Sequence, residues 1–411
     1  MSDPTAERGR WAALSLITLC HVIGATAQYG INTLAPFYQQ ELELSRTQIG
    51  LFFTAFYSGM ACLSFAAGWL ADRLGVRAAT LNGHLFLGLF TAAAALAPSF
   101  GWAFGSFLLA GLGYSFLNPA STKGVMAWFR RDERATAMGA KQTGVPAGGV
   151  VAALVAPSLV WFIGWRGALA AIGMINLLFG FFFFALWQEP AHEFAQTNRG
   201  SRHGEKLRTV FQVQSLVAVS FGTAVLLVAQ MSLLTYVPLY LKETMGFSAY
   251  WASQALSIVQ LGGMIGRVGW GMVSDRLFRG RRKIVLVLIG VLSVILSLTM
   301  SFMTRATPLI ILLSMIFLAG LCMVGFQGVS YALIGELAGA AQTGAALGLV
   351  ITANSVGTIF GTPFFGYLVD ATDSYAVAWQ ALAGIVFVGI LCLVLFLKEP
   401  KADLASVGSG S

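Results

Sequence analysis

The sequence predicts an all-α membrane protein, with twelve transmembrane helices in two pseudo-symmetric six-helix bundles. Hydrophobic residues make up 57% of the 411-residue chain and charged residues only 10%, whereas roughly a quarter of the residues in an ordinary soluble domain are charged. Apolar stretches long enough to cross a hydrocarbon core of about 30 Å recur along the whole chain. We place the helices at 11–37, 48–70, 77–98, 100–128, 135–160, 165–188, 212–240, 249–274, 283–303, 307–335, 342–368 and 376–397.

The longest polar interruption divides the twelve helices into six and six. It reads "QEPAHEFAQTNRGSRHGEKLR", residues 188–208. We therefore expect an N-terminal bundle over 1–187, a cytoplasmic central loop over 188–210, and a C-terminal bundle with a short tail over 211–411. Residues 203 positions apart match along two helices and their loop, which supports two related halves. The matched pairs include Gly68 and Gly271, Asp72 and Asp275, and Arg73 and Arg276.

The basic residues predict how the chain crosses the membrane. The net charge is +8, and most Lys and Arg residues fall in the inter-helix segments of one side. Because positively charged loops stay in the cytoplasm, we expect both termini there, in a bacterial inner membrane. Only Arg46, Arg166, Lys242 and Arg305 fall on the other side. The positive charge therefore suits a lipid bilayer and not a nucleic acid, and we expect a monomer.

Two loops resemble the signature loop of the major facilitator superfamily. They are "GWLADRLGVR", residues 68–77, and "GMVSDRLFRGRR", residues 271–282. The resemblance implies two bundles around a central cavity that opens to alternate sides of the membrane. It also implies close helix approach at the glycines and a cytoplasmic charge cluster that breaks and re-forms as the halves rock. The residues implied in this gate are Gly68, Asp72, Arg73, Arg77, Gly271, Asp275 and Arg276. The alternative is that the charges only follow the positive-inside rule.

Arg267 is a permanent cation inside a predicted membrane helix. It lies eight residues before Asp275, about 12 Å from the helix end, and an arginine there costs roughly 2.5 to 3.5 kcal/mol even on a lenient insertion scale. Ser253, Gln260 and Ser274 share its face of the helix. We interpret Arg267 as the cation that binds an anionic group of the substrate, as implied by a local resemblance to porters of oxalate and formate, monocarboxylates and nitrate. The alternative is a structural arginine bonded to carbonyl groups or to a neighbouring helix.

Polar side chains on several other helices are candidate substrate ligands. Gln28 and its repeat partner Gln230 place one amide in each half, and Gln260 lies two turns before Arg267. The remaining candidates of this kind are Tyr114, Asn118, Tyr331 and Asn354. Each of these groups also fits a structural role, as a hydrogen bond between helices.

Two lysines are candidates for a second cation in the cavity. Lys123 and Lys141 lie within predicted helices, and their repeat positions are Ala332 and Val350. The internal symmetry therefore does not require a lysine at either place, which favours a functional role. The alternative is that both side chains extend to the cytoplasmic surface.

Uptake of an anion has to be coupled to another ion. Moving a monoanion into a cell against an inside-negative potential costs about 2.3 kcal/mol per 100 mV, so we expect symport with a proton or antiport with a counter-anion. His21 and His84 are the candidate proton carriers, because histidine titrates near neutral pH. The alternatives are that the substrate itself takes the proton, and that the histidines only contact neighbouring helices.

The predicted function is secondary active transport of a small organic anion, expected to be a carboxylate. No Asp or Glu lies deep in a predicted helix, which argues against efflux of organic cations. Export of amphipathic or drug-like solutes is the alternative, favoured by the 31 phenylalanines. A membrane enzyme or sensor is disfavoured, because the sequence contains no nucleophile paired with a base and no phosphate loop. The four cysteines lack the spacing of metal ligands, so we expect free thiols and no cofactor.

Overall fold

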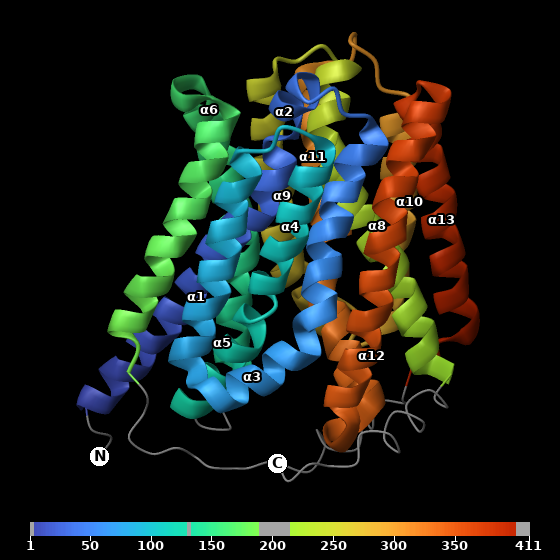
Figure 1. The fold of residues 1–411 in the computed structure, drawn as a ribbon. Coiled ribbons are helices and arrows are strands. Elements are labelled where there is room, and N and C mark those ends of the chain that lie inside the picture. Colours follow the sequence, from blue (N-terminus) through green and yellow to red (C-terminus); the bar gives the residue numbers. More distant parts are fainter. Residues whose placement is uncertain (1–3, 130–132, 189–213, 400–411) are drawn as a thin grey trace.

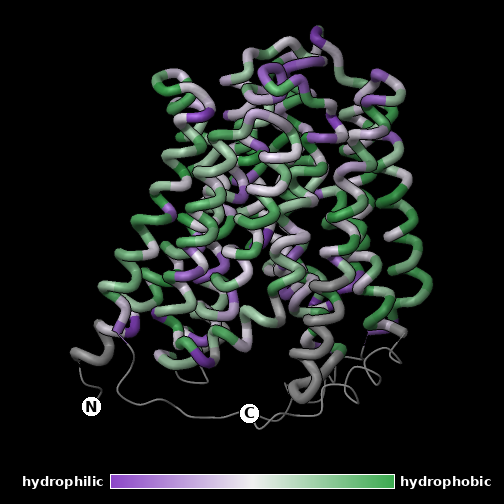
Figure 2. Tube along the Cα trace, in the orientation of Figure 1, coloured by the Kyte–Doolittle hydropathy of each residue, from purple (hydrophilic) through white to green (hydrophobic). Residues whose placement is uncertain are grey.

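Long helices run side by side through the molecule, and the described residues contain no strand (Figure 1). The structure is a computed structural model that describes residues 4–129, 133–188 and 214–399. The predicted central loop lies outside these residues, apart from its first position. Hydrophobic residues cover most of the helix lengths, while hydrophilic residues lie inside the bundle and at its ends (Figure 2). This distribution suits a protein whose outer surface contacts lipid.

Two bends in the first half occur at glycines with left-handed backbone angles. The elements of this half are α1 (Pro4–Thr33), α2 (Ala35–Glu41), α3 (Arg46–Ala95), α4 (Phe100–Tyr114), α5 (Leu117–Trp128) and α6 (Arg134–Leu186). Gly75 in α3 has φ 78° and Gly164 in α6 has φ 68°, a conformation that glycine adopts without a Cβ clash. The chain turns at these positions, so α3 and α6 each contain two of the predicted transmembrane helices.

The second half repeats this arrangement with two π-helical segments. Its elements are α8 (Gln214–Glu243), α9 (Ala249–Met272), η1 (Val273–Leu277), α10 (Arg282–Ser301), α11 (Leu309–Ala319), η2 (Gly320–Val324), α12 (Gln327–Thr372) and α13 (Tyr375–Phe396). The π-helical segment η1 ends α9, and η2 lies between α11 and α12. Like α3 and α6, α12 is long enough to contain parts of two predicted transmembrane helices.

The predicted fold class is confirmed. All twelve predicted apolar stretches fall on helices of the structure. Among the described residues, eight helical stretches are long and apolar enough to cross a membrane, and one of them, Ala137–Leu186, is 50 residues long and holds two predicted spans. The protein is therefore an integral membrane protein built from two six-helix bundles.

The two halves are bonded to each other at the end of the bundle that carries α2, which we call the closed end. Arg46 at the start of α3 donates a hydrogen bond from Nε to Glu243 at the end of α8, over 3.1 Å. Gln39 Nε2 donates to the same carboxylate over 2.9 Å. Thr54 Oγ1 donates to the carbonyl oxygen of Ile359 over 2.8 Å. These contacts join α2 and α3 of the first half to α8 and α12 of the second.

The signature-loop glycines have no close neighbours at the opposite end, which we call the open end and where α1 begins and α13 ends in Figure 1. A Cβ atom added at Gly68, Gly139 or Gly271 would meet no atom within 4 Å. At the closed end, by contrast, a Cβ atom at Gly50 would lie 3.0 Å from the carbonyl oxygen of Thr362 in the other half. The close helix approach expected at Gly68 and Gly271 is therefore not made in this conformation.

Candidate substrate site

Arg267 lies on α9 at a place where elements of both halves meet. It is partly buried, and its Nε atom is buried without a hydrogen-bond partner among the described residues. It is close enough to interact electrostatically with Tyr29 of α1, Tyr114 of α4 and Tyr331 of α12. Because Tyr29 and Tyr114 belong to the first half and Tyr331 to the second, the guanidinium faces the boundary between the halves.

A group of phenols and amides surrounds this boundary. Gln28 Nε2 donates a hydrogen bond to Tyr57 Oη over 2.7 Å, and the Gln260 side chain lies close to Tyr29. Tyr331 is 40% exposed and interacts electrostatically with Tyr57 of the other half. Tyr331 of the second half therefore lies near a phenol of the first half.

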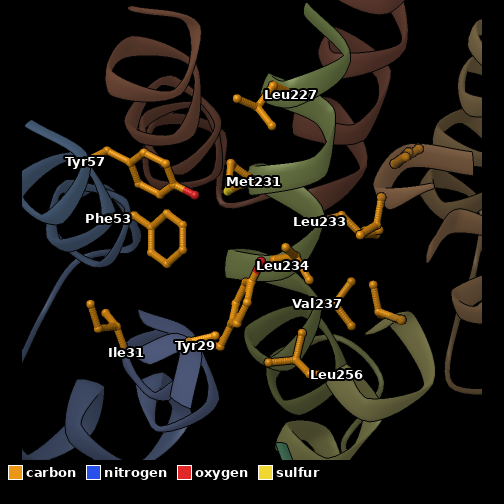
Figure 3. Packing of buried hydrophobic residues seen from close by; sticks show 14 of the residues in the cluster. Tyr29, Ile31, Phe53, Tyr57, Leu227, Met231, Leu233, Leu234, Val237 and Leu256 are labelled. Carbon is orange, nitrogen blue, oxygen red and sulfur yellow. The ribbon is translucent and has the colours of Figure 1, made fainter. Parts of the chain in front are cut away.

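Figure 3 shows how Tyr57 and Tyr29 approach the second half. Tyr57 points toward Met231 of α8, and the hydroxyl of Tyr29 lies beside Leu234 of the same helix. Tyr29 and Tyr57 were not among the predicted site residues. Tyr29 directly follows Gln28, but Tyr57 stands in an apolar stretch with no polar pattern around it, so only the fold identifies it.

The predicted amides divide between the halves. Gln28 bonds to Tyr57 within the first half, whereas Gln230 Oε1 accepts a hydrogen bond from Gln327 Nε2 over 3.3 Å within the second. Asn354 on α12 is 8% exposed, and its Oδ1 has no hydrogen-bond partner among the described residues. The amides of helices one and seven therefore lie in separate hydrogen-bond networks in this conformation.

Lys141 is enclosed by oxygens of α5. It is 1% exposed, and its Nζ donates to Asn118 Oδ1 over 3.0 Å, Ser121 Oγ over 3.0 Å and Thr122 Oγ1 over 2.7 Å. Ser121 Oγ is also 2.8 Å from His21 Nε2. The structure thus brings together three predicted site residues, Lys141, Asn118 and His21.

The second candidate histidine lies deeper in the same half. His84 is fully buried, with Nδ1 at 3.1 Å from Asn176 Oδ1 and Nε2 at 3.3 Å from Cys20 Sγ. It interacts electrostatically with His21. The two histidines therefore lie near each other, but each has its own hydrogen-bond partners.

Lys123 lies apart from the Lys141 cluster. Its Nζ donates to the carbonyl oxygen of Ala71 over 3.4 Å, beside the first signature loop. It therefore contacts α3 near the open end, in contrast to Lys141, which contacts the interior of the first half.

The predicted gate residues at the open end have partners within their own halves. Arg73 stacks on Trp69 at 3.9 Å, and Arg77 donates to the carbonyl oxygen of Phe184 and stacks on its ring. The side chain of Asp72 lies outside the described side chains.

The matching cluster in the second half depends on an arginine that we did not single out. Asp275 pairs with Arg282, which also pairs with Glu336 over 3.2 Å, while Arg276 is exposed. Arg282 follows Asp275 by seven residues, across the turn that ends α9. The sequence alone does not indicate which of the four nearby arginines makes this pair.

Comparison with known proteins agrees with this architecture. The family model described as Major Facilitator Superfamily matches residues 17–315 and 270–410. A hexuronate transporter of Bacillus subtilis is 26% identical over 95% of this chain and 96% of its own. A probable sulfoacetate transporter of Cupriavidus necator is 26% identical over 93% of this chain and 92% of its own.

A solved structure shares the fold. It is a bacterial homologue of the human lysosomal transporter Spinster, in an inward-facing and unoccupied conformation. The TM-score is 0.80, the identity is 16%, and the match covers 98% of this chain and 100% of that one.

Proposed function

Because the chain belongs to the major facilitator superfamily and is an integral membrane transporter and not an enzyme, we propose that it carries a small organic anion by alternating access. The relatives are described as transporters of hexuronate and sulfoacetate, both of which are acid anions. The proposed substrate is a carboxylate of the sugar-acid type. The proposed location is a bacterial inner membrane, with both termini in the cytoplasm.

The observation that carries this proposal is the position of Arg267 between the halves. A permanent cation with a buried, unpartnered Nε offers a charged donor, and arginine can bind a carboxylate through two parallel hydrogen bonds. Tyr29, Tyr114 and Tyr331 lie close enough to interact with it electrostatically. Their hydroxyl groups can donate to or accept from the hydroxyls of a sugar acid.

The hydrogen bonds between the halves at the closed end, and the lack of close neighbours at Gly68 and Gly271, support an inward-facing state. With the termini in the cytoplasm, the open end faces the cell interior and the Arg46, Glu243 and Asp370 contacts close the outer side. Transport then requires these contacts to break while the helices around Gly68 and Gly271 close. Uptake of the anion is coupled to a proton or to a counter-anion.

A groove lined mainly by aromatic residues favours a second candidate function, the export of amphipathic solutes. The groove has a volume of about 470 Å³, lies where α6 meets α9 at the closed end, and is lined by Ser158, Trp161, Phe162, Ser248, Tyr250 and Trp251. Trp161 and Phe162 are each 81% exposed. Aromatic residues at a membrane interface are also expected without any ligand, so Arg267 remains the stronger indication.

Thermal stabilisation by ligands tests the proposal. The purified protein is heated in detergent with glucuronate, galactonate, sulfoacetate, chloride and a cationic drug, beside Arg267→Gln. A ligand at about 100 times its Kd adds about 2.7 kcal/mol of stability. We expect an organic acid to stabilise the parent and not the variant.

The matched control is Arg305→Gln, because Arg305 is an exposed arginine that bonds to the carbonyl oxygen of Thr244. It should respond to ligands as the parent does. Stabilisation of Arg267→Gln as strong as that of the parent would assign the arginine a structural role. Stabilisation by the drug alone would favour the export of amphipathic solutes.

A further inference from the structure

Lys141 and Arg267 are cations within membrane helices, but their chemistry differs. A guanidinium stays protonated in any protein environment, whereas an ammonium can release a proton to become a neutral amine. Arg267 therefore offers a fixed charge, and Lys141 an exchangeable one. A transporter that couples an anion to a proton needs both kinds of group.

The described side chains that bond to Lys141 carry no compensating negative charge. All three of its close oxygen partners, on Asn118, Ser121 and Thr122, are neutral. Among the residues that the structure describes, no carboxylate bonds to it. A buried charge without a counter-charge costs several kcal/mol, and a lysine can remove that cost by releasing its proton. The three oxygens nevertheless provide acceptors for the ammonium when the proton is present.

Asn118 connects this lysine with the space between the halves. Asn118 is exposed, whereas Lys141 beneath it is 1% exposed. Tyr114 precedes Asn118 by about one helical turn and interacts electrostatically with Arg267 of the other half. The exposed Asn118 amide bonds directly to the buried amine, so its rotation would open Lys141 to the solvent that Asn118 contacts.

On its other side Lys141 is linked to His21. Ser121 Oγ lies 3.0 Å from Lys141 Nζ and 2.8 Å from His21 Nε2, so one hydroxyl bonds to both bases. The Nδ1 atom of His21 is buried and has no hydrogen-bond partner among the described residues. A proton on Lys141 can therefore be shared with a second base without crossing apolar space.

We propose that Lys141 carries the coupling proton, exchanging it with water through Asn118 and sharing it with His21 through Ser121. The proposal rests on the proposed anion transport. The amine takes a proton from the outer side when the anion binds at Arg267, and the ammonium returns that proton to water on the inner side when the anion leaves. The titratable groups that interact with it are Cys20 and His21 of α1. His84 of α3 interacts with His21, and Tyr114 of the same half interacts with Arg267 across the boundary.

Transport in proteoliposomes separates coupling from binding. Uptake of labelled glucuronate is measured with the outside one pH unit more acidic, and glucuronate exchange is measured at equal pH on both sides. Symport of one proton with one monoanion should give about tenfold accumulation per pH unit. Lys141→Arg keeps the charge but cannot release a proton, so it should exchange glucuronate without accumulating it.

The control Arg305→Gln removes an exposed cation that bonds to the carbonyl oxygen of Thr244 and not to the cluster. It should accumulate glucuronate as the parent does. Accumulation by Lys141→Arg that matches the parent in response to the pH difference would overturn the proposal. Loss of exchange together with accumulation would assign Lys141 to substrate binding and overturn it as well.

A measurement without substrate keeps the inference separate from the proposed function. The melting temperatures of the parent and of Lys141→Gln are compared in detergent between about pH 6 and pH 10. An exchangeable proton at Lys141 should make the difference between the two melting temperatures vary by about 2–4 °C over this range. If the Gln variant does not fold, Lys141→Arg takes its place in the comparison. A difference that stays constant across the range excludes proton exchange at Lys141, whether or not glucuronate is transported.

Discussion

The carboxylate of Asp370 binds Thr47 across the boundary between the two halves. Its Oδ2 accepts hydrogen bonds from the Thr47 amide over 2.8 Å and from the Thr47 hydroxyl over 2.6 Å, and its Oδ1 accepts one from the Arg46 amide over 3.0 Å. Amides in the first turn of a helix have no partner within the helix and favour a negative charge. A residue of α12 therefore caps α3, and the first turn of α3 keeps these bonds only while the closed end stays closed.

Replacing this cap should open the closed end. Asp370→Ala removes three hydrogen bonds to a charged group, each of which contributes about 1.5–3 kcal/mol. We expect the population with a separated closed end to rise by about tenfold or more, since about 1.4 kcal/mol corresponds to a factor of ten. Electron spin distance measurements between labels on Gln40 and Ala306, one in each half, would detect the change.

Asp373→Ala is the matched control for this change. Asp373 also pairs with Arg46, but over 3.7 Å and with a side chain that is 91% exposed, and exposed ion pairs contribute little. Its distance distribution should stay close to that of the parent. Equal shifts in both variants would show that the α3 cap does not hold the closed end together.

Tyr57→Phe should weaken the binding of hydroxylated acids selectively. The change removes the hydroxyl that accepts from Gln28 Nε2 over 2.7 Å, while Gln28 Oε1 is already without a partner among the described residues. A lost hydrogen bond contributes about 0.5–1.5 kcal/mol, so the Kd for glucuronate should rise by roughly 3- to 10-fold. Calorimetric titration with propionate provides the comparison, and an equal loss for both acids would argue that Tyr57 does not contact substrate hydroxyls.

Gly111→Ala should destabilise the packing of α3 against α4. A Cβ atom at Gly111 would overlap the carbonyl oxygen of Phe56, which belongs to the backbone of α3. Overpacking of this kind costs about 1–3 kcal/mol, so the melting temperature in detergent should fall. Gly105→Ala changes a position of the same helix at which a Cβ atom would meet no atom within 4 Å. Its melting temperature should equal that of the parent. A Gly111→Ala protein that is as stable as Gly105→Ala would contradict the close contact.

The carboxyl group of Glu41, at the end of α2, should make a pH-dependent contribution to the stability of the protein. Hydrogen bonds from Trp165 Nε1 and from Arg166 hold the pKa of this carboxyl below its ordinary value of 4.5. A carboxyl with a lowered pKa in the folded state stabilises the protein above the pKa of the unfolded chain, and this contribution is lost as the pH falls through the folded value. Glu41→Gln should therefore lower the melting temperature at pH 7 but have little effect in more acidic solution.

Glu43→Gln serves as the control for Glu41, because Glu43 is an exposed carboxylate two residues away on the same segment. Its melting temperature should follow that of the parent at both pH values. A difference between Glu41→Gln and the parent that is the same at neutral and acid pH would exclude the ionised carboxylate as its cause.

The sequence by itself determined the class of protein and its division into halves. Apolar stretches of membrane length are visible directly, because each must exceed the thickness of the hydrocarbon core. The repeat of Gly68, Asp72 and Arg73 at Gly271, Asp275 and Arg276 revealed the second half. Arg267 stood out because a charge within an apolar helix is costly enough to require an explanation.

The tertiary structure alone decided which polar groups meet. Lys141 and Lys123 look alike in the sequence, yet one lies among the oxygens of Asn118, Ser121 and Thr122 and the other against Ala71. The bonds from Asp370 to the first turn of α3 join residues 323 positions apart. Helix periodicity defines the faces of each helix but not the neighbour that each face meets, because that depends on the packing of side chains from distant segments.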